Sequence, residues 1–272
     1  MKKFIATVLT VTTLAAVFAG CKSNTASSDA SNASDASSAA TNGKFVVGFD
    51  AEFPPMGFKD DQGNYVGFDL DLAKETAKRL GKEFVAQPIA WDSKDQELAS
   101  GNIDCIWNGF TISGREDQYT WTKAYMENDQ VVVVKNGSSI KTLADLAGKK
   151  VVVQKDSSGL AAVEEKADLK NSFAELVQVD SYLNAMMELE SGSVDAIIMD
   201  EIVARYEIQT SGKDFAVLDE AVASETYGVG FKLGNTELCD QVQKTLEDMA
   251  KDGTLANISN KWFGKDVTIV GK

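Results

Sequence analysis

One phrase occurs twice in the 272-residue chain, and this repeat limits the fold more than any other feature. LASGNIDCIWNG occupies residues 98–109 and LESGSVDAIIMD occupies residues 189–200, with Leu, Ser-Gly, Asp and Ile at matching offsets. Each copy reads as a helix end, a Ser-Gly stop and a short apolar strand, because Gly accepts the left-handed conformation that ends helices. GKFVVGFD at 43–50 and GKKVVVQK at 148–155 both read as opening strands. The chain therefore repeats one strand-and-helix unit, which predicts two lobes.

Apolar residues at helical spacing predict helices at about 70–80, 183–190 and 238–249, and a last helix that runs to Trp262-Phe263. Asp180 is expected to cap the second of these helices, and Thr254 is expected to cap the last. Met186 and Met187 are expected to lie in the core, because methionine fills irregular apolar gaps.

Alternating strands and helices predict an α/β architecture with helix-covered sheets. Ligands of such sheets lie outside the carboxyl ends of the strands, near topological switch points. The first copy of the repeated phrase ends in Asn108-Gly109 and the second ends in Asp200. If the two lobes face each other, these strand ends line one cleft.

The N-terminal residues are expected to lie outside the folded body. Two lysines precede the acid-free stretch FIATVLTVTTLAAVFA, which ends in Ala19 and is followed by Gly20, an order that predicts a secretory signal peptide over residues 1–20. Cys21 follows directly and resembles the acylated cysteine of a bacterial lipobox; the alternative is an ordinary signal peptide that leaves a free thiol. Residues 22–43 contain no aromatic residue and no Leu, Ile or Val. With Cys21, they predict a lipidated cysteine on a disordered tether.

Composition argues against several classes of function. The net charge of −14 argues against nucleic acid as a partner, because phosphates require Lys and Arg. The chain has no histidine, which removes the commonest general base and metal ligand, and we expect no metal and no cofactor. Besides Cys21, only Cys105 and Cys239 are present. A disulfide between these two and a pair of buried free thiols both remain open.

An ordered set of motifs covers essentially all of the chain from residue 44. They are GFDAEFPPMGF at 48–58, GFDLDLAKETAKRLG at 67–81, IAWD at 89–92, SGNIDCIWNGFTISGRE at 100–116, LADLAGKKVVVQKDSSG at 143–159, SGSVDAIIMDEIVA at 191–204 and YGVGF at 227–231. With this set the chain resembles the extracytoplasmic solute-binding proteins of ABC transporters that bind polar amino acids, family 3. The resemblance implies a two-lobed periplasmic-binding-protein-like fold of type II, with the ligand cleft between the lobes.

The resemblance also implies a hinge of two crossovers, near residues 126–131 and 225–230. Lobe 1 is then expected over 44–128 plus 228–272, and lobe 2 over 129–227. A ligand that bridges the lobes binds the closed state better, so binding and hinge closure are coupled.

A free amino acid offers an α-carboxylate, an α-ammonium and a side chain. Arg115 matches the family's arginine, whose planar fork suits a carboxylate. Ser157 and Ser158 precede a predicted helix over GLAAVEEK, and N–H groups at a helix start form an anion site. They are expected to hold the carboxylate from lobe 2. Asp200 matches the family's acid for the ammonium, with helix capping before EIVARYEIQ as an alternative role.

The remaining contacts follow from the same resemblance. The Gly109 carbonyl and the Thr111 hydroxyl are expected to complete the ammonium site. Phe53 and Trp91 match two aromatic positions that enclose the ligand's stem, and the polar loop around Phe53 disfavours its burial in a core. Gln154 is expected to reach the ligand side chain. Trp107 is either core or cleft wall.

The class of ligand depends on Asp50 and Glu52, at the tip of the opening strand. Strand alternation puts both carboxylates on the same side. Two carboxylates at one end of a pocket repel each other unless a cation lies between them, which favours arginine or lysine. If Glu52 faces water instead, the ligand is neutral, such as glutamine or cystine.

We therefore expect a binding protein that delivers an extracellular L-amino acid to ABC transporter permease subunits. It is expected to be an extracytoplasmic monomer, held at the bacterial cell membrane only by its lipid anchor, or else periplasmic. The rival interpretation is a periplasmic dehydratase-type enzyme, because a fold does not fix a function. The absence of histidine and the presence of a full amino-acid clamp argue against an enzyme.

Overall fold

The computed structural model describes residues 43–272. The predicted signal peptide, Cys21 and all but the last residue of the predicted tether lie outside the described residues. Within residues 43–272, every helix falls short of the length and apolar character that a membrane-spanning helix requires.

The repeated phrase folds into two matching units, as predicted. The first unit consists of β1 (Lys44–Phe49), α1 (Phe68–Arg79), β5 (Glu83–Pro88), the 3₁₀ turn η1 (Trp91–Ser93), α2 (Lys94–Ser100) and β6 (Cys105–Thr111). The second consists of β9 (Lys150–Gln154), α3 (Ser158–Glu165), α4 (Ala167–Ser172), β10 (Glu175–Val179), α5 (Tyr182–Ser191) and β11 (Ala196–Asp200). In each unit the last helix ends at a left-handed glycine, Gly101 with φ 78° and Gly192 with φ 81°.

The two units share one continuous sheet, in the order β10-β9-β11-β8-β13-β6-β1-β5. β1 pairs in parallel with β5 and β6, and β9 pairs in parallel with β10 and β11. Two long antiparallel strands, β8 (Met126–Lys135) and β13 (Ala223–Phe231), join the units in the middle. From either edge of the sheet, the strands of one unit therefore occur in the same order: β10-β9-β11 in the second unit corresponds to β5-β1-β6 in the first.

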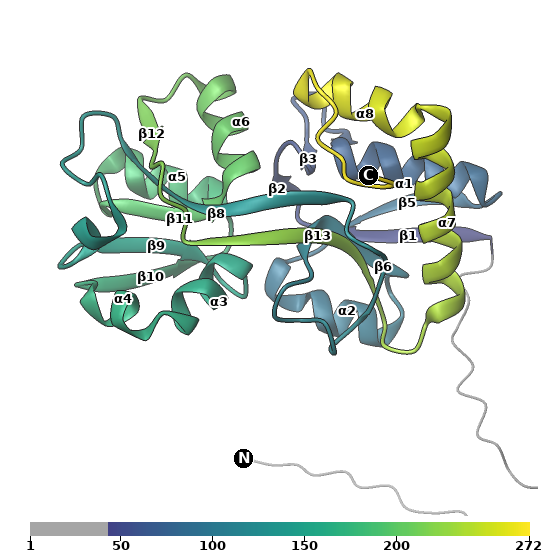
Figure 1. Ribbon diagram of the computed structural model, residues 1–272, viewed down its shortest axis with the longest axis horizontal. Coiled ribbons are helices and arrows are strands. Elements are labelled where there is room, and N and C mark those ends of the chain that lie inside the picture. The colour runs from purple at the N-terminus through teal and green to yellow at the C-terminus, as the bar shows by residue number, and fades with distance from the viewer. Residues whose placement is uncertain (1–42) are drawn as a thin grey trace, which may run out of the picture. The chain divides into compact units, whose positions relative to one another are not determined.

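The remaining elements complete the two groups that we call lobe 1 and lobe 2 (Figure 1). Lobe 1 contains the first unit with β2 (Glu52–Phe53), β3 (Gly57–Lys59), β4 (Tyr65–Val66), β7 (Thr120–Trp121), α7 (Thr236–Asp252) and α8 (Thr254–Phe263). Lobe 2 contains the second unit with η2 (Leu143–Leu146), α6 (Glu201–Ser211) and β12 (Phe215–Val217). β8 and β13 pass from one lobe to the other, at the positions where the sequence predicts the crossovers.

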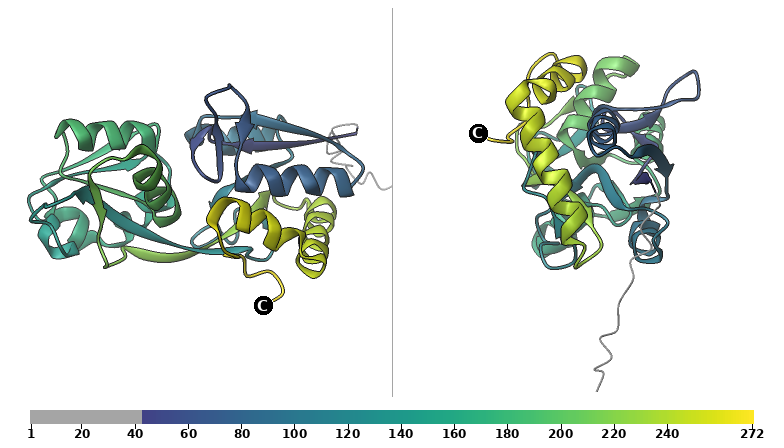
Figure 2. Two further views of the ribbon diagram at one scale, coloured as in Figure 1. Left: turned by 90° about the horizontal axis from the view of Figure 1, so that it is seen from above. Right: turned by 90° about the vertical axis from the view of Figure 1, so that its right-hand side faces the viewer.

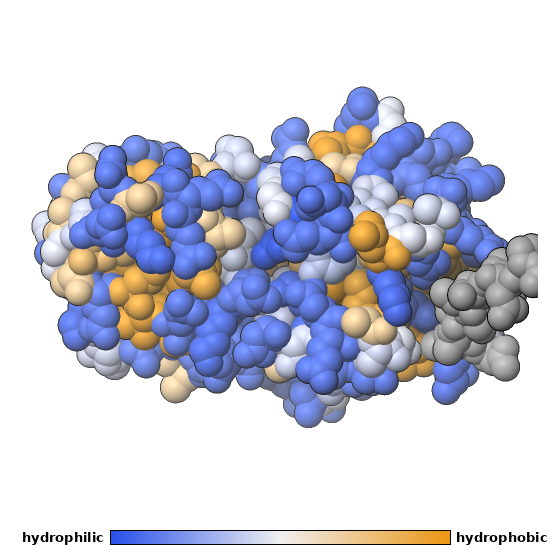
Figure 3. Space-filling model, turned by 90° about the horizontal axis from the view of Figure 1, so that it is seen from below, coloured by the Kyte–Doolittle hydropathy of each residue, from blue (hydrophilic) through white to orange (hydrophobic). Residues whose placement is uncertain are grey.

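Helices cover the sheet in both lobes (Figure 2). α7 packs beside α8 and α1 on lobe 1 and buries one apolar stripe, formed by Cys239, Val242, Leu246 and Met249. This stripe confirms the helix predicted at 238–249. Hydrophilic side chains cover most of the face seen from below, and apolar ones gather in separate patches over each lobe (Figure 3).

Three local predictions about helix ends and faces are wrong. Ser181, not Asp180, caps α5, because its Oγ accepts the Asn184 N–H at 3.3 Å while Asp180 pairs with Lys155. Met186 is buried, but Met187 is 57% exposed because α5 turns only one narrow stripe inward. Gly253 occupies the position before α8, so Thr254 is its first residue and makes no side-chain cap.

Candidate functional site

A small cavity lies between the lobes and brings together ten of the twelve predicted ligand-binding residues. Its lining consists of Phe53, Trp91, Asn108, Gly109, Thr111, Arg115, Gln154, Ser157, Ser158 and Asp200. Asp50 and Glu52 do not line it. The residues come from the strand ends of both units, where a doubly wound sheet places its ligands.

The β6 strand forms much of the lobe 1 wall. β6 continues past Asn108-Gly109, where the sequence predicts its end, and reaches Thr111. Gly109 has φ +57°, and a Cβ there would lie 3.0 Å from the Phe53 ring and 3.2 Å from the Tyr227 ring. Only glycine fits this backbone, which is crowded by two aromatic rings.

A buried carboxylate that the sequence interpretation missed fixes the Gly109 backbone. Asp69, in the first turn of α1, accepts the Gly109 N–H at 2.6 Å and the Tyr125 hydroxyl at 2.8 Å. Burial raises the pKa of Asp69 to about 7, against the lowering effect of these hydrogen bonds. The GFDLDL motif contains the signal, since an acid lies between the buried Phe68 and Leu70.

Arg115 reaches across the cavity from lobe 1. Its Nη1 donates to the Thr111 carbonyl at 3.4 Å, and its Nη2 donates to the Asp156 carbonyl of lobe 2 at 3.3 Å. The guanidinium carbon lies 5.4 Å from the centre of the Phe110 ring. A guanidinium has five N–H donors, so others stay free to bind a carboxylate in the fork geometry that arginine provides.

The start of α3 forms the wall of lobe 2 opposite Arg115. Ser157 caps this helix, because its Oγ accepts the Leu160 N–H at 3.1 Å. The same hydroxyl donates to the Gln154 carbonyl at 2.8 Å, and Ser158 begins the helix. The free N–H groups of a helix start favour an anion in the cavity.

Asp200 brings a carboxylate to the same cavity from the end of β11. It occupies the position before α6, but its side chain makes no cap. Instead its Oδ1 accepts the Tyr227 hydroxyl at 2.6 Å and the Asn128 amide at 3.1 Å. Burial first, and then the charge of Glu225, raise the pKa of Asp200 to about 8. The structure therefore does not support the capping alternative.

Two further contacts join the lobes directly around the cavity. Lys94, at the start of α2, forms an ion pair with Asp156 of lobe 2 and is almost fully buried. The Gln154 amide donates to the Asp50 carboxylate at 2.7 Å. These contacts place the lobes in a closed arrangement over the cavity.

Comparisons with known proteins agree with this geometry. Residues 45–265 match the family model described as "Bacterial extracellular solute-binding proteins, family 3". The chain belongs to this family. It is 34% identical over 230 residues to the L-cystine-binding protein TcyJ of Escherichia coli (strain K12), which covers 83% of this chain and 85% of that protein.

Two more family members illustrate the extent of the similarity. The L-cystine-binding protein TcyA of Bacillus subtilis (strain 168) is 31% identical over 264 residues, 96% of each chain. The histidine-bound substrate-binding protein of an ABC uptake transporter from Streptococcus pneumoniae is 36% identical, with a TM-score of 0.81. It covers 84% of this chain and 95% of its own. All three family members are named as binding proteins, not enzymes.

The aromatic residues that the family resemblance assigns to the cleft differ in burial. Phe53 is 6% exposed, contrary to the expectation from its polar loop, and its ring lies 5.9 Å from that of Tyr182. Trp91 is half-buried and meets Phe110 edge to face. Trp107 is fully buried against Tyr125 and belongs to the core rather than to the cavity wall.

Strand alternation predicted that Asp50 and Glu52 lie on the same side, and this prediction is wrong. β1 ends at Phe49, and the Asp50 Oδ1 then accepts the Glu52 N–H at 2.8 Å, which turns the chain. Asp50 is buried and Glu52 is exposed. Burial raises the pKa of Asp50, and the bonds from the Glu52 N–H and Gln154 lower it.

Both described cysteines are free thiols, so the alternative of a disulfide between Cys105 and Cys239 is not realised. Over residues 43–272, no group of three or more His, Cys, Asp or Glu side chains is arranged to hold a metal ion.

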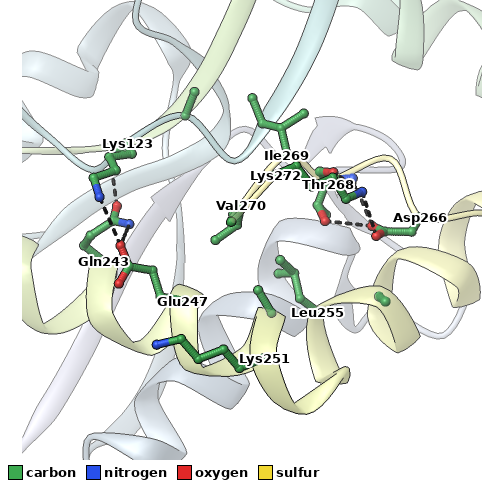
Figure 4. Close-up of a pocket in the computed structure, with 14 residues that line it drawn as sticks. Lys123, Gln243, Glu247, Lys251, Leu255, Asp266, Thr268, Ile269, Val270 and Lys272 are labelled. Atoms are coloured by element: carbon green, nitrogen blue, oxygen red, sulfur yellow. Dashed lines mark hydrogen bonds and ion pairs between the residues drawn. The ribbon is translucent and has the colours of Figure 1, made fainter.

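A second, larger hollow lies on lobe 1 between α7, α8 and the C-terminal segment (Figure 4). Four of its five charged side chains pair with one another. Lys123 pairs with Glu247 at 3.2 Å, and Lys272 pairs with Asp266 at 2.9 Å. None of the predicted site residues lines it. The interlobe cavity is therefore the better candidate for the functional site.

Proposed function

We propose that the chain binds a free L-amino acid between its lobes and delivers it to the permease of an ABC transporter. The observation that carries this proposal is the pairing of opposite charges around one small interlobe cavity. Arg115 and the start of α3 offer positive partners for an α-carboxylate, and Asp200 offers a negative partner for an α-ammonium. The names of the three family relatives agree with an amino-acid ligand.

The other lining residues complete this pose. The Gly109 carbonyl and the Thr111 hydroxyl accept from the ammonium beside Asp200. Phe53 and Trp91 enclose the aliphatic stem, where apolar burial contributes most to the affinity of a small ligand. Gln154 and Asn108 face the side-chain end with amide groups.

We propose a neutral ligand, with L-cystine as the first to test. The argument for a basic ligand required two free carboxylates near one end of the pocket. Asp50 instead accepts the Gln154 amide, and Glu52 is exposed away from the cavity lining. Two of the three relatives described above are named for L-cystine. Tighter binding of arginine than of cystine or glutamine would contradict this choice.

Delivery depends on closure about the two crossing strands. In this proposal lobe 1 spans residues 44–128 plus 228–272, and lobe 2 spans 129–227. Because the carboxylate partners lie on both lobes, the ligand stabilises the closed form, which the permease then recognises. The protein acts as a monomer and stays at the outer face of the membrane through a lipid on Cys21.

A thermal-shift screen against the common amino acids and cystine tests the proposed function. A ligand that binds only the folded state raises the apparent stability by RT ln(1 + [L]/Kd), so a true ligand gives a dose-dependent shift. Titration calorimetry then ranks the positive compounds. No shift with any amino acid, in protein that unfolds cooperatively, would contradict the proposal.

A further inference from the structure

A second buried carboxylate lies behind Asp200. Glu225 belongs to β13, one of the two strands that cross between the lobes, and is 7% exposed, while Asp200 is 3% exposed. The β8–β13 register pairs Glu225 with Asn128, which fixes these two side chains beside each other.

Amide side chains of β8 connect Glu225 to the cavity. The Asn128 amide donates to the Glu225 Oε1 at 2.8 Å and to the Asp200 Oδ1 at 3.1 Å. The Gln130 amide donates to the same Glu225 Oε1 at 3.0 Å and to the Ser158 hydroxyl at 3.1 Å. Glu225 therefore holds both amides, and each amide contacts one residue of the cavity wall.

The charges of this network are not balanced by a protein cation. Among the described residues, Asp200 and Glu225 accept hydrogen bonds only from neutral amides and tyrosine hydroxyls. Two buried carboxylates this close cannot both stay ionised without a large cost, unless a cation or a proton lies with them.

Other charged and titratable groups face the pair from the elements around it. Burial first, and then the charges of Asp200 and Glu225, raise the pKa of Tyr182 of α5, which is fully buried. Glu127 and Asp129 of β8 and Glu201 of α6 line the groove behind Glu225 and are acidic. Glu201 already pairs with Arg205. Arg115 lines the cavity itself, where it is assigned to the carboxylate of the ligand.

We propose that Glu225 is a positioning residue that completes the ammonium site from the hinge, and that its charge keeps on Asp200 a proton which the ligand's α-ammonium displaces. This inference rests on the proposed function, because it requires a ligand with an ammonium group. On binding, the ammonium takes the place of the proton as the counter-charge, and the proton passes to the solvent. Ligand binding and the deprotonation of Asp200 are therefore coupled.

The pKa of Asp200 supports the direction of this linkage. Without a cation beside it, burial and the charge of Glu225 raise that pKa to about 8. An ammonium at hydrogen-bond distance lowers it, because an opposite charge favours the ionised form. Asp200 thus holds its proton below about pH 8 in the free state and loses it in the complex. Affinity then rises with pH toward about 8, at most about tenfold per pH unit for one proton, and levels off above it.

Titration calorimetry in two buffers with different protonation enthalpies measures the released proton directly. The probes are L-cystine, L-glutamine and L-arginine, each from about pH 6 to about pH 8, a range that spans the rise expected from proton linkage. Glu225→Gln keeps an oxygen that accepts from Asn128 and Gln130 but removes the charge. Glu127→Gln is the matched control, because Glu127 is exposed and lies on β8, which pairs with the strand of Glu225.

For wild type and Glu127→Gln we expect release of up to one proton at about pH 7 and affinity that rises several-fold per pH unit. For Glu225→Gln we expect less proton release and an affinity that rises less steeply with pH than in wild type, because burial still raises the pKa of Asp200 but the charge of Glu225 no longer does. Its melting temperature should equal or exceed that of wild type, which verifies the fold.

Wild-type binding without proton release, or an unchanged pH profile in Glu225→Gln, would overturn the inference and leave the proposed function intact. Failure of wild type to bind any of the probes or any other amino acid would overturn both. The two failures are thus distinguishable in one set of experiments.

Discussion

Removal of one charge from the ion pair that joins the lobes is expected to weaken ligand binding without touching the ligand's own partners. Lys94 of lobe 1 pairs with Asp156 of lobe 2, and Asp156 has a left-handed backbone with φ 54°. Asparagine tolerates this conformation well, so Asp156→Asn preserves the turn before α3. The Asp156 carbonyl, which accepts from Arg115, also stays in place.

The exposure of the two side chains determines how much closed-state stability the substitution is expected to remove. The Lys94 side chain is 2% exposed and the Asp156 side chain is 51% exposed. The contribution of this pair to the stability of the closed form therefore lies between two cases. A surface ion pair contributes up to about 1 kcal/mol, and disruption of a buried one costs about 3–5 kcal/mol. The new amide oxygen still accepts from Lys94, so we expect about 1–2 kcal/mol of lost closed-state stability. If the open form dominates without ligand, this corresponds to a Kd about five- to thirtyfold weaker.

Calorimetric titration of Asp156→Asn with the amino acid that gives the largest thermal shift measures this loss. Small-angle scattering at one sub-saturating ligand concentration should show a larger radius of gyration for the variant, because fewer molecules are closed. Asp180→Asn is the matched control, since Asp180 pairs with Lys155 inside lobe 2 and is exposed. Equal affinities for both variants and wild type would refute the assignment of the Lys94 pair to closure.

Three further outcomes test the site and its surroundings. Arg115→Ala should abolish binding of every amino acid in calorimetry, and Arg115→Lys should recover little, because lysine lacks the planar fork; near-normal affinity would reject the proposed pose. Cys21→Ser should release the protein from membranes at unchanged affinity, and a variant that still sediments with carbonate-washed membranes would reject lipidation. Cys105 and Cys239 should react with a thiol reagent only after unfolding, because both are buried and burial raises the pKa of Cys239 to about 11; fast labelling of native protein would contradict the buried thiols.

The parts of the fold that follow from local sequence were predictable. Gly101 and Gly192 end helices in both units, and each is followed by a short apolar strand, so the repeat identifies β6 and β11. The ten cavity residues could be predicted from the sequence because each lies in a motif that ends a strand or starts a helix. These signals depend on a few neighbouring residues and not on distant contacts.

The residues that support the cavity were not predictable in the same way. Asn128 and Gln130 lie in the polar run ENDQ, which reads as an exposed loop. Gln130 is buried because β8 has a partner strand on each side there, β11 and β13, and Asn128 pairs with Glu225 of β13. Glu225 becomes a neighbour of Asp200 through the same pairing. The separation of Asp50 from Glu52 depends on one side-chain hydrogen bond that ends the strand alternation.

The pair of strands between the lobes limits the kind of motion that the molecule can make. β8 and β13 are hydrogen-bonded from the Gln130–Ala223 pair to the Met126–Tyr227 pair, so stretching or sliding one strand against the other would break backbone bonds. Twist and bend of a two-stranded ribbon break none of them. In the proposed closure the lobes are therefore limited to bending and twisting about these two strands, which returns Arg115 to the same place opposite α3 at each cycle. A reproducible trajectory lets a few contacts discriminate between ligands, because a molecule that does not fit has no alternative docking of the lobes to exploit.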